Sequence, residues 1–530
     1  MAGLLVLLGA SPALGKGRHD PPERVLIIVL DQFRPDYVDE FDMRNVRKLM
    51  RDGASFRNAY LGHMASETVI THNVITSGQL PKDMGWADEA FRDSDDVLGE
   101  GADSMWISGS LTRDDFNDLI ADKGYAKLGD YLKAAHPGTK FIAAGQKDYA
   151  VHTSNGPTGD ISVTFSGRNF DCDGDGANNW RGPTGFNVPA YLSAPSCGRY
   201  YVDSSSSVTY GTGTTSPAWM YPLDGNRFAV GFDPAHQGGD VWVTDAGMAM
   251  MEREPWSGML LTLGSIDKAS HMWGGITDDG FYPPGSEEEQ AHLRFNAKVA
   301  DEQVGRLMRR LRDLGQLDET LVVLTTDHGG QPSRRFHGVD EANRGNNNWY
   351  YGTTENGTFL APSPSLAPLI ATGNVRFSYQ DSAVRTWLTD TSTAAKREAA
   401  RVMATLPDVI ASYQLDGRRY RLERANLGRM SLREGVYWAL RGQEIVDTMA
   451  APYAADVVGL LKDDTSYGVA GDHGGAQRPV QEIPIVFAGA DVGSRDPSHA
   501  LRSVDILPTI LRELRVKPRP GLDGRAVELP

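Results

Sequence analysis

The sequence has little cysteine. Cys172 and Cys197 are the two cysteines among 530 residues, and neither belongs to a Cys-x-x-Cys pair. This argues against a zinc site built from thiolates. In an exported protein the two cysteines could form one disulfide that closes a modest loop, and two free thiols are the alternative. Any metal site in this chain is therefore expected to use oxygen and nitrogen ligands.

Positive charge is also in short supply. Lys and Arg number 53 against 69 Asp and Glu, which gives a formal net charge of −16. This balance argues against nonspecific nucleic-acid binding, which needs a basic face, so we expect no nucleic-acid recognition. A protein of this charge that binds an anionic substrate has to supply positive charge locally, and bound metal ions are the usual source.

Long apolar runs are absent. The apolar stretch 3–13 is too short to span a bilayer, and no later segment has the length and apolarity of a membrane helix. Small residues around Ala13 and Gly15 resemble a signal-peptide cleavage region, although the basic start of such a peptide is missing. We predict a signal peptide over residues 1–18 and a periplasmic or secreted protein. A disordered cytosolic start is the alternative.

Four short apolar runs recur along the rest of the chain. They are rich in Val, Ile and Leu and do not alternate, which is typical of strands buried on both faces. Helix-like stretches lie between them, notably over 288–314, which ends in basic residues before a glycine, and over 391–406. The pattern predicts an α/β fold with a mostly parallel central sheet flanked by helices. The runs occupy residues 25–30, 259–266, 321–326 and 483–489.

Two stretches break this rhythm. Residues near 150–240 are rich in Gly, Ser, Asn, Asp and Tyr, and residues near 331–385 are rich in Gly, Asn and Pro. Both carry many aromatic residues, so we interpret them as irregular insertions that cap one end of the sheet, where the candidate site lies. We therefore predict one catalytic domain over residues 23–530 with these two insertions.

Metal-ligand side chains follow the apolar runs. Three runs end at an Asp, and open parallel sheets bind ligands at the carboxyl ends of their strands. Two segments contain Asp-His-Gly-Gly, whose glycines let the backbone approach a ligand closely. Each residue alone is more simply a cap, a turn residue or a packed imidazole, but the joint pattern predicts two zinc-like ions. The candidate ligands are Asp31, Asp267, His271, Asp327, His328 and His473.

A candidate nucleophile lies near the start of the chain. Thr68 opens an apolar, helix-like segment that ends at Gly78. A hydroxyl at a helix N-terminus faces free N–H groups and a favourable dipole, and a neighbouring dication would lower its pKa. The same residue type and position fit a plain N-cap, so the nucleophile interpretation depends on the metal ligands.

These segments resemble, in their order, the alkaline phosphatase superfamily. The segments are DQFRPDY at Asp31, ETVITHNVITSGQLP, DKASH, TTDHGG and GDHGG. The likeness is to single-chain bacterial alkaline phosphatases of the phosphate-irrepressible type and to nucleotide pyrophosphatase/phosphodiesterases, from about residue 23 to the C-terminus. It implies two Zn²⁺ ions, one held by Asp31, Thr68, Asp327 and His328, the other by Asp267, His271 and His473.

The resemblance also implies a mechanism. Thr68 would attack phosphorus in line, and water activated at the second zinc would hydrolyse the phosphothreonine. We therefore expect metal-dependent hydrolysis of small phosphorylated substrates. A catalytically silent, metal-stabilised binding protein is the alternative of another class.

Two positions depart from the monoesterases of that superfamily. These carry an Asn about 21 residues after the nucleophile that holds a phosphoryl oxygen, where this chain has Glu89, or Asp88 if the alignment shifts by one. They also carry Lys-x-Arg, where this chain has Lys147 and Tyr149. The carboxylate of Glu89 and the absence of a guanidinium at Tyr149 weaken the binding of a phosphate dianion and favour a diester substrate. The overall layout and Lys147 favour a monoester, which we expect by a slight margin.

A third metal candidate lies within the first insertion. Asp171, Asp173 and Asp175 alternate before Gly176, as at the opening of a calcium loop. The twelfth position is Gly182 instead of Glu, so the EF-hand form is not met. The three aspartates are a candidate Ca²⁺ site, with an acidic surface turn as the alternative.

Overall fold

The computed structural model describes residues 20–170, 180–192, 234–273, 287–338, 349–360, 362–469 and 471–530. The predicted signal peptide over 1–18 lies outside the described residues, as do Cys172, Cys197 and the candidate calcium ligands Asp171, Asp173 and Asp175. The signal peptide, a disulfide and the Ca²⁺ site stay predictions. Among the described residues, no helix combines the length and the apolarity needed to cross a bilayer.

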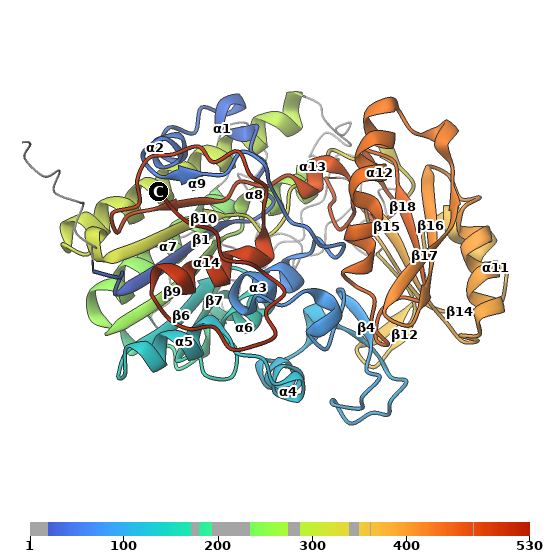
Figure 1. The fold of residues 1–530 in the computed structure, drawn as a ribbon, viewed down its shortest axis with the longest axis horizontal. Coiled ribbons are helices and arrows are strands. Elements are labelled where there is room, and N and C mark those ends of the chain that lie inside the picture. Colours follow the sequence, from blue (N-terminus) through green and yellow to red (C-terminus); the bar gives the residue numbers. More distant parts are fainter. Residues whose placement is uncertain are drawn as a thin grey trace, which may run out of the picture.

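The main sheet has eight strands in the order β2-β20-β10-β1-β9-β6-β7-β8 (Figure 1). Its five central strands, from β10 to β7, run parallel, whereas β20 and β8 pair antiparallel to their neighbours. The predicted mostly parallel α/β sheet is confirmed. The strands are β1 (Arg24–Leu30), β2 (Ala54–Ser55), β6 (Lys140–Gly145), β7 (Ile161–Phe170), β8 (Trp180–Phe186), β9 (Trp256–Leu263), β10 (Thr320–Thr325) and β20 (Val486–Ala488).

Helices cover both faces of this sheet, which explains why its strands lack alternation. In β1 the odd-numbered residues 25–29 pack into the core on one face and the even-numbered residues 26–30 into the core on the other. The first face carries α3 (Thr68–Ser77), α5 (Leu128–Ala135), α6 (Asp148–Asn155) and α14 (Ile506–Glu513). The second carries α1 (Tyr37–Glu40), α2 (Arg44–Asp52), α7 (Pro234–Arg253), α8 (Ser265–Trp273) and α9 (Glu287–Asp313) (Figure 1).

The expected helices correspond closely to observed ones, whereas the fourth expected strand differs. The helix expected over 288–314 is α9, and the one expected over 391–406 is α11 (Thr393–Met403). The fourth apolar run forms only the short β20, antiparallel to β10. Pro484 lies inside that run, and a proline cannot donate to a strand ladder, so the strand begins after it.

A second sheet lies beside the first, in the orange half of Figure 1. Its seven strands, in the order β13-β12-β14-β15-β18-β16-β17, all pair antiparallel. Figure 1 also shows α11 and α12 packed beside this sheet. The elements are β12 (Tyr350–Thr354), β13 (Gly357–Phe359), β14 (Val375–Gln380), β15 (Ala383–Leu388), β16 (Val409–Asp416), β17 (Arg419–Ala425), β18 (Val457–Leu461) and α12 (Leu432–Asp447).

This sheet differs from the irregular insertion expected over 331–385. Within the described part of that range, β12 to β15 are regular strands, and Phe377 and Tyr379 of β14 are buried in the core. Gly, Asn and Pro in the connecting segments dominated the composition and concealed these short strands. In the range 150–240, the described residues contain the β7–β8 pair, which extends the main sheet.

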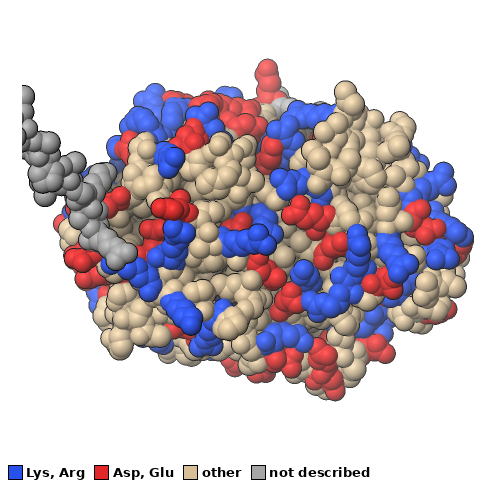
Figure 2. All heavy atoms as spheres, viewed as in Figure 1, with Lys and Arg blue, Asp and Glu red and all other residues tan. Residues whose placement is uncertain are grey.

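Short elements complete the described chain. Three two-stranded sheets pair β3 (Ala59–Tyr60) with β21 (Leu501–Arg502), β4 (Ala90–Arg92) with β5 (Met105–Ile107), and β11 (Arg335–Phe336) with β19 (Thr465–Ser466). The remaining helices are α4 (Arg113–Lys123), α10 (Ala367–Ile370) and α13 (Arg478–Gln481). On the face drawn in Figure 2, Lys and Arg of the described residues are interspersed with Asp and Glu instead of forming one basic patch, in keeping with the charge argument.

A buried cation joins the two sheets. Arg385 on β15 is fully buried, and its guanidinium lies 2.5 Å from carboxylate oxygens of Asp381 and Asp88 and 3.3 Å from Glu67. Glu67 directly precedes α3 and Asp88 lies just before β4, so Arg385 connects the second sheet to the catalytic side of the first. Burial raises the pKa of Asp88 to about 7, against the lowering effect of Arg385.

We expect Arg385→Met to lower the free energy of unfolding by about 3–5 kcal/mol, because it leaves buried carboxylates without their cation. Arg421→Met is the matched control. Arg421 pairs with Asp416 on the surface, and such a pair contributes at most about 1 kcal/mol. Urea unfolding followed by fluorescence measures both variants, and equal shifts would contradict the structural role of Arg385.

Candidate active site

The parallel register brings polar residues to one edge of the main sheet. Asp31 directly follows β1, and its N–H donates to the carbonyl of Leu263 at the end of β9 over 3.0 Å. On the other side of β1, Val29 is in register with Thr325 of β10, two residues before Asp327. The sequence positions are hundreds of residues apart, yet parallel pairing places these strand ends side by side.

Asp31, Asp327 and His328 form the first candidate ligand group. One ligand atom of each lies within 4.8 Å of the others. His328 Nε2 is 3.6 Å from Asp31 Oδ1 and from Asp327 Oδ2, while its Nδ1 contacts the carbonyl of Gly329 at 3.1 Å. That carbonyl accepts a hydrogen bond from the Nδ1–H group, which leaves the Nε2 lone pair facing the carboxylates. Burial lowers the pKa of His328 to about 3, so the imidazole is neutral, as metal binding requires.

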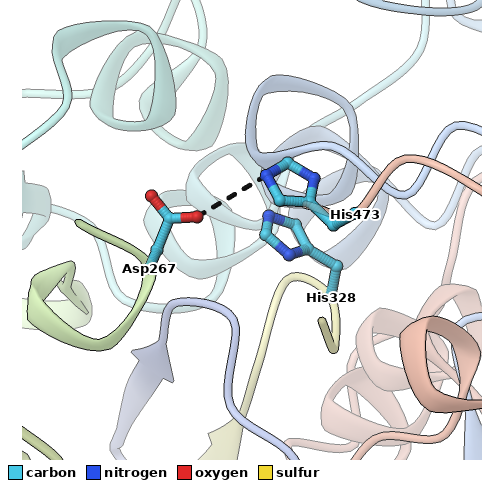
Figure 3. Close-up of side chains that lie close together, drawn as sticks. All are labelled: Asp267, His328 and His473. Carbon is cyan, nitrogen blue, oxygen red and sulfur yellow. Dashed lines mark ion pairs between the residues drawn. The ribbon is translucent and has the colours of Figure 1, made fainter. Parts of the chain in front are cut away.

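Asp267, His271 and His473 form a second group next to the first. Asp267 and His271, the predicted Asp-x-x-x-His pair, both lie on α8. His271 Nε2 is 3.2 Å from Asp267 Oδ1. His473 Nε2 lies 3.5 Å from the same oxygen. The rings of His473 and His328 stack with their centroids 3.7 Å apart, so the two groups adjoin, as Figure 3 shows for Asp267, His328 and His473.

The chemistry of these groups fits bound cations. Asp31 Oδ1 and Asp327 Oδ2 are buried and accept no hydrogen bond from the described residues. Lys147 Nζ contacts Asp31 at 2.8 Å and Asp267 at 2.7 Å, but one ammonium faces three buried carboxylates. Burial and the charges of Asp267 and Asp327 raise the pKa of Asp31 well above its usual range. Dications would relieve this repulsion and provide the missing partners.

Thr68 lies beside the first ligand group. It is the first residue of α3, which ends at Gly78 with φ +67°, so the helix predicted over this segment is confirmed. Thr68 Oγ1 accepts a hydrogen bond from Lys147 Nζ over 3.0 Å and lies 3.3 Å from His328 Nε2. Among the described residues, no side chain caps the helix start, so its first N–H groups and its dipole face the site.

The predicted substrate residues line one cavity with Thr68. Glu89, Lys147 and Tyr149 all border this cavity of about 390 Å³. Asp88 is fully buried against Arg385, whereas Glu89 is the carboxylate that reaches the cavity. Aromatic rings from α6 and the second sheet complete its walls; they are Tyr149, Trp349, Tyr350, Phe359 and Tyr379.

Sequence reasoning missed several supporting residues. Glu67 Oε2 lies 3.1 Å from His473 Nδ1, and its other oxygen contacts Arg385. His72 Nδ1 contacts the carbonyl of Thr68 at 2.8 Å. Asp472, the acid of the second Asp-His-Gly-Gly, comes within ligand distance of His271 and His473 but already accepts hydrogen bonds from its own loop. The position of Glu67 directly before Thr68 was the one feature of the sequence that could have indicated a supporting role. No feature of the sequence pointed to Arg385.

The fold and this edge of the sheet define a protein of the alkaline phosphatase-like superfamily. A sequence model of the type I phosphodiesterase / nucleotide pyrophosphatase family matches residues 25–474, and the chain belongs to this family. Membership supports hydrolysis of phosphoric esters by a metal-dependent enzyme. The superfamily resemblance inferred from the sequence motifs is thereby confirmed.

Individual relatives agree with this assignment. The chain is 21% identical to the alkaline phosphatase PhoD of Zymomonas mobilis over 98% of this chain and 91% of that protein. It is 28% identical to the alkaline phosphatase PhoK of a Sphingomonas species, over 26% of either chain.

Solved structures share the fold. Wild-type alkaline phosphatase PafA aligns with a TM-score of 0.60 and 14% identity, over 96% of this chain and 98% of that one. Human ectonucleotide pyrophosphatase/phosphodiesterase 5 aligns with a TM-score of 0.50 and 11% identity, over 95% and 97%.

We expect Glu67→Gln to lower the affinity for zinc by about 10- to 100-fold, because a carboxylate that orients a ligating imidazole strengthens it as a ligand. Competition with a chromophoric chelator measures this affinity. Glu423→Gln, in the surface pair with Arg401, serves as the control and is expected to leave zinc affinity unchanged. Unaltered affinity in Glu67→Gln would show that Glu67 does not support His473.

Proposed function

We propose that this chain hydrolyses phosphoric esters through a phosphothreonine formed on Thr68, with phosphomonoesters slightly favoured over diesters. One observation carries the proposal. The Thr68 hydroxyl stands at the start of α3, accepts a hydrogen bond from Lys147 and adjoins two groups of buried carboxylates and imidazoles. The arrangement around Thr68 thus combines a candidate nucleophile, a neighbouring cation and candidate ligands for metal ions.

The residues of the two groups would hold two Zn²⁺ ions. Oxygen and nitrogen donors of this kind suit zinc. When bound, the ions neutralise charge on the phosphoryl group and on the attacking and departing oxygens. The proposed ligands are Asp31, Thr68, Asp327 and His328 for one ion and Asp267, His271 and His473 for the other.

The chain's own residues account for the first step. The Thr68 oxygen attacks phosphorus as the bond from phosphorus to the ester oxygen breaks; the alcohol leaves with that electron pair and takes a proton from solvent. The Thr68 proton is released to solvent. Lys147 Nζ, 3.0 Å from Oγ1, and the positive end of the α3 dipole stabilise the negative charge that develops on the Thr68 oxygen.

A water molecule completes the reaction. It attacks phosphorus of the phosphothreonine, the Thr68 O–P bond breaks, and a proton restores the hydroxyl as the phosphate product leaves. Attack in line with the departing oxygen requires that the ester enter from the cavity, onto which Thr68 opens.

Diester hydrolysis is the second candidate. It is favoured by Glu89, whose carboxylate borders the same cavity as Thr68 and repels a phosphate dianion more than a monoanion. Lys147 and the alkaline phosphatases among the relatives support the monoester.

The N-terminal sequence supports a periplasmic or secreted location. The Ca²⁺ site at Asp171, Asp173 and Asp175 stays a prediction.

We expect Thr68→Ala to reduce kcat/KM for nitrophenyl phosphate by about 10⁴-fold or more, because the nucleophile is removed. Thr71→Ala is the matched control on the same helix, since its buried hydroxyl faces His63. It is expected to keep activity within about tenfold of wild type. Equal activity of Thr68→Ala and wild type would remove the enzyme function and leave a binding protein.

We expect Glu89→Asn to raise the ratio of nitrophenyl phosphate to bis(nitrophenyl) phosphate hydrolysis by about tenfold. Removal of one unit charge a few ångströms from a dianion is worth about 1–4 kcal/mol. Steady-state kinetics with both substrates measures the ratio in the variant and in wild type. An unchanged ratio would mean that Glu89 does not act on the phosphoryl charge.

A further inference from the structure

Glu89 differs from the fully buried acids near it. Glu67 pairs with His473 and Arg385, and Asp88 pairs with Arg385. Within the described part of the chain, Glu89 forms no ion pair with Lys, Arg or His. Its side chain is half-buried and borders the cavity, so its carboxylate has no Lys, Arg or His partner there among the described residues.

Tyrosine hydroxyls hold the Glu89 carboxylate in place. Tyr379 Oη donates to Glu89 Oε2 over 2.8 Å, and Tyr350 also hydrogen-bonds to Glu89. Burial and the nearby glutamate charges raise the pKa values of Tyr350 and Tyr379 well above their usual range, so both hydroxyls stay protonated and donate. A carboxylate that accepts hydrogen bonds from the protein in this way still has lone pairs that face the cavity. These lone pairs can accept a hydrogen bond from a donor group on the ligand.

Aromatic rings surround this carboxylate. The rings of Tyr350 and Tyr379 stack at 5.3 Å, and Arg385 packs over Tyr379 at 4.2 Å, which makes this wall rigid. The rings of Tyr149, Trp349 and Phe359 are half-buried at the cavity. Ring faces beside a carboxylate attract a cation both by the quadrupole of the rings and by charge.

The carboxylate borders the cavity on the side of Tyr149. A Cβ built at Gly109 would lie 3.0 Å from Glu89 Oε1 and 4.0 Å from the ring of Tyr149, so the absent side chain leaves room for both. Tyr149 is two residues from Lys147, whose ammonium contacts the Thr68 hydroxyl. Glu89 and Thr68 border the same cavity, so one ligand in it can contact both.

We propose that the cavity takes phosphoric esters of primary amino alcohols, with the ester's ammonium group hydrogen-bonded to Glu89 and packed against the aromatic wall while its phosphoryl group lies at Thr68. The proposal rests on the proposed function and names its substrate class. The ammonium offsets the repulsion between Glu89 and the phosphoryl charge, which a simple alkyl ester leaves uncompensated. Glu89 thereby acts as a specificity-determining residue.

The test compares O-phosphoethanolamine with propyl phosphate, which replaces the ammonium by a methyl group of similar size. We expect wild type to favour O-phosphoethanolamine by about 10- to 100-fold in kcat/KM, the worth of a charge-assisted hydrogen bond. Glu89→Gln is expected to bring the ratio close to one. Asp148→Asn is the matched control, because Asp148 is an exposed carboxylate at the same cavity, and it is expected to keep the wild-type ratio.

A second measurement keeps this test separate from that of the proposed function. Calorimetry on zinc-loaded Thr68→Ala compares the binding of O-phosphoethanolamine with that of propyl phosphate. We expect O-phosphoethanolamine to bind about tenfold more tightly. If nitrophenyl phosphate is not hydrolysed by wild type, the proposed function fails, and this binding ratio alone decides the ammonium site.

Three results would overturn the ammonium site. The first is a ratio near one in wild type, in turnover and in binding. The second is a ratio that Glu89→Gln leaves unchanged while circular dichroism shows an intact fold. The third is an equal preference of wild type for 2-hydroxyethyl phosphate and O-phosphoethanolamine. It would show that Glu89 accepts a hydrogen bond from a hydroxyl just as well and that the charge of the ammonium plays no part.

Discussion

Electrostatic repulsion among buried carboxylates is the constraint on which the site depends. Asp31, Asp267 and Asp327 meet at the carboxyl edge of the main sheet and are almost completely buried. Lys147 is the cation within contact distance of two of them, and it cannot balance three. The fold therefore gathers negative charge at the candidate site, and bound metal ions would balance it in a chain of net charge −16.

The second sheet acts on this centre from outside. Arg385 on β15 holds Glu67, which holds His473, so a strand of the second sheet positions a candidate metal ligand of the first. The same sheet contributes the aromatic wall beside Glu89. The candidate nucleophile and Asp31, Asp267 and Asp327 thus lie at the edge of the parallel sheet, and the antiparallel sheet adds the rings of Tyr350, Phe359 and Tyr379 to the cavity.

Local sequence patterns predicted those parts of the molecule whose cause is local. The runs of β1, β9 and β10 lack alternation because both faces are covered, and α9 shows its amphipathic period and basic C-terminal turn. Asp31, Asp327 and Thr68 stand at or just beyond element ends, and only their joint occurrence with the histidines indicated a site. The second sheet escaped prediction because β12 to β15 are short strands between Gly-, Asn- and Pro-rich segments.

The α/β class, the candidate ligands and the candidate nucleophile could be predicted from the amino-acid sequence, because each rests on short segments of the chain. Packing between distant segments was needed to show that Glu89, and not Asp88, reaches the cavity, and that Glu67 lies between Arg385 and His473. These relations join residues that lie up to several hundred positions apart. They depend on which side chains packing brings together, and no local periodicity or spacing records that.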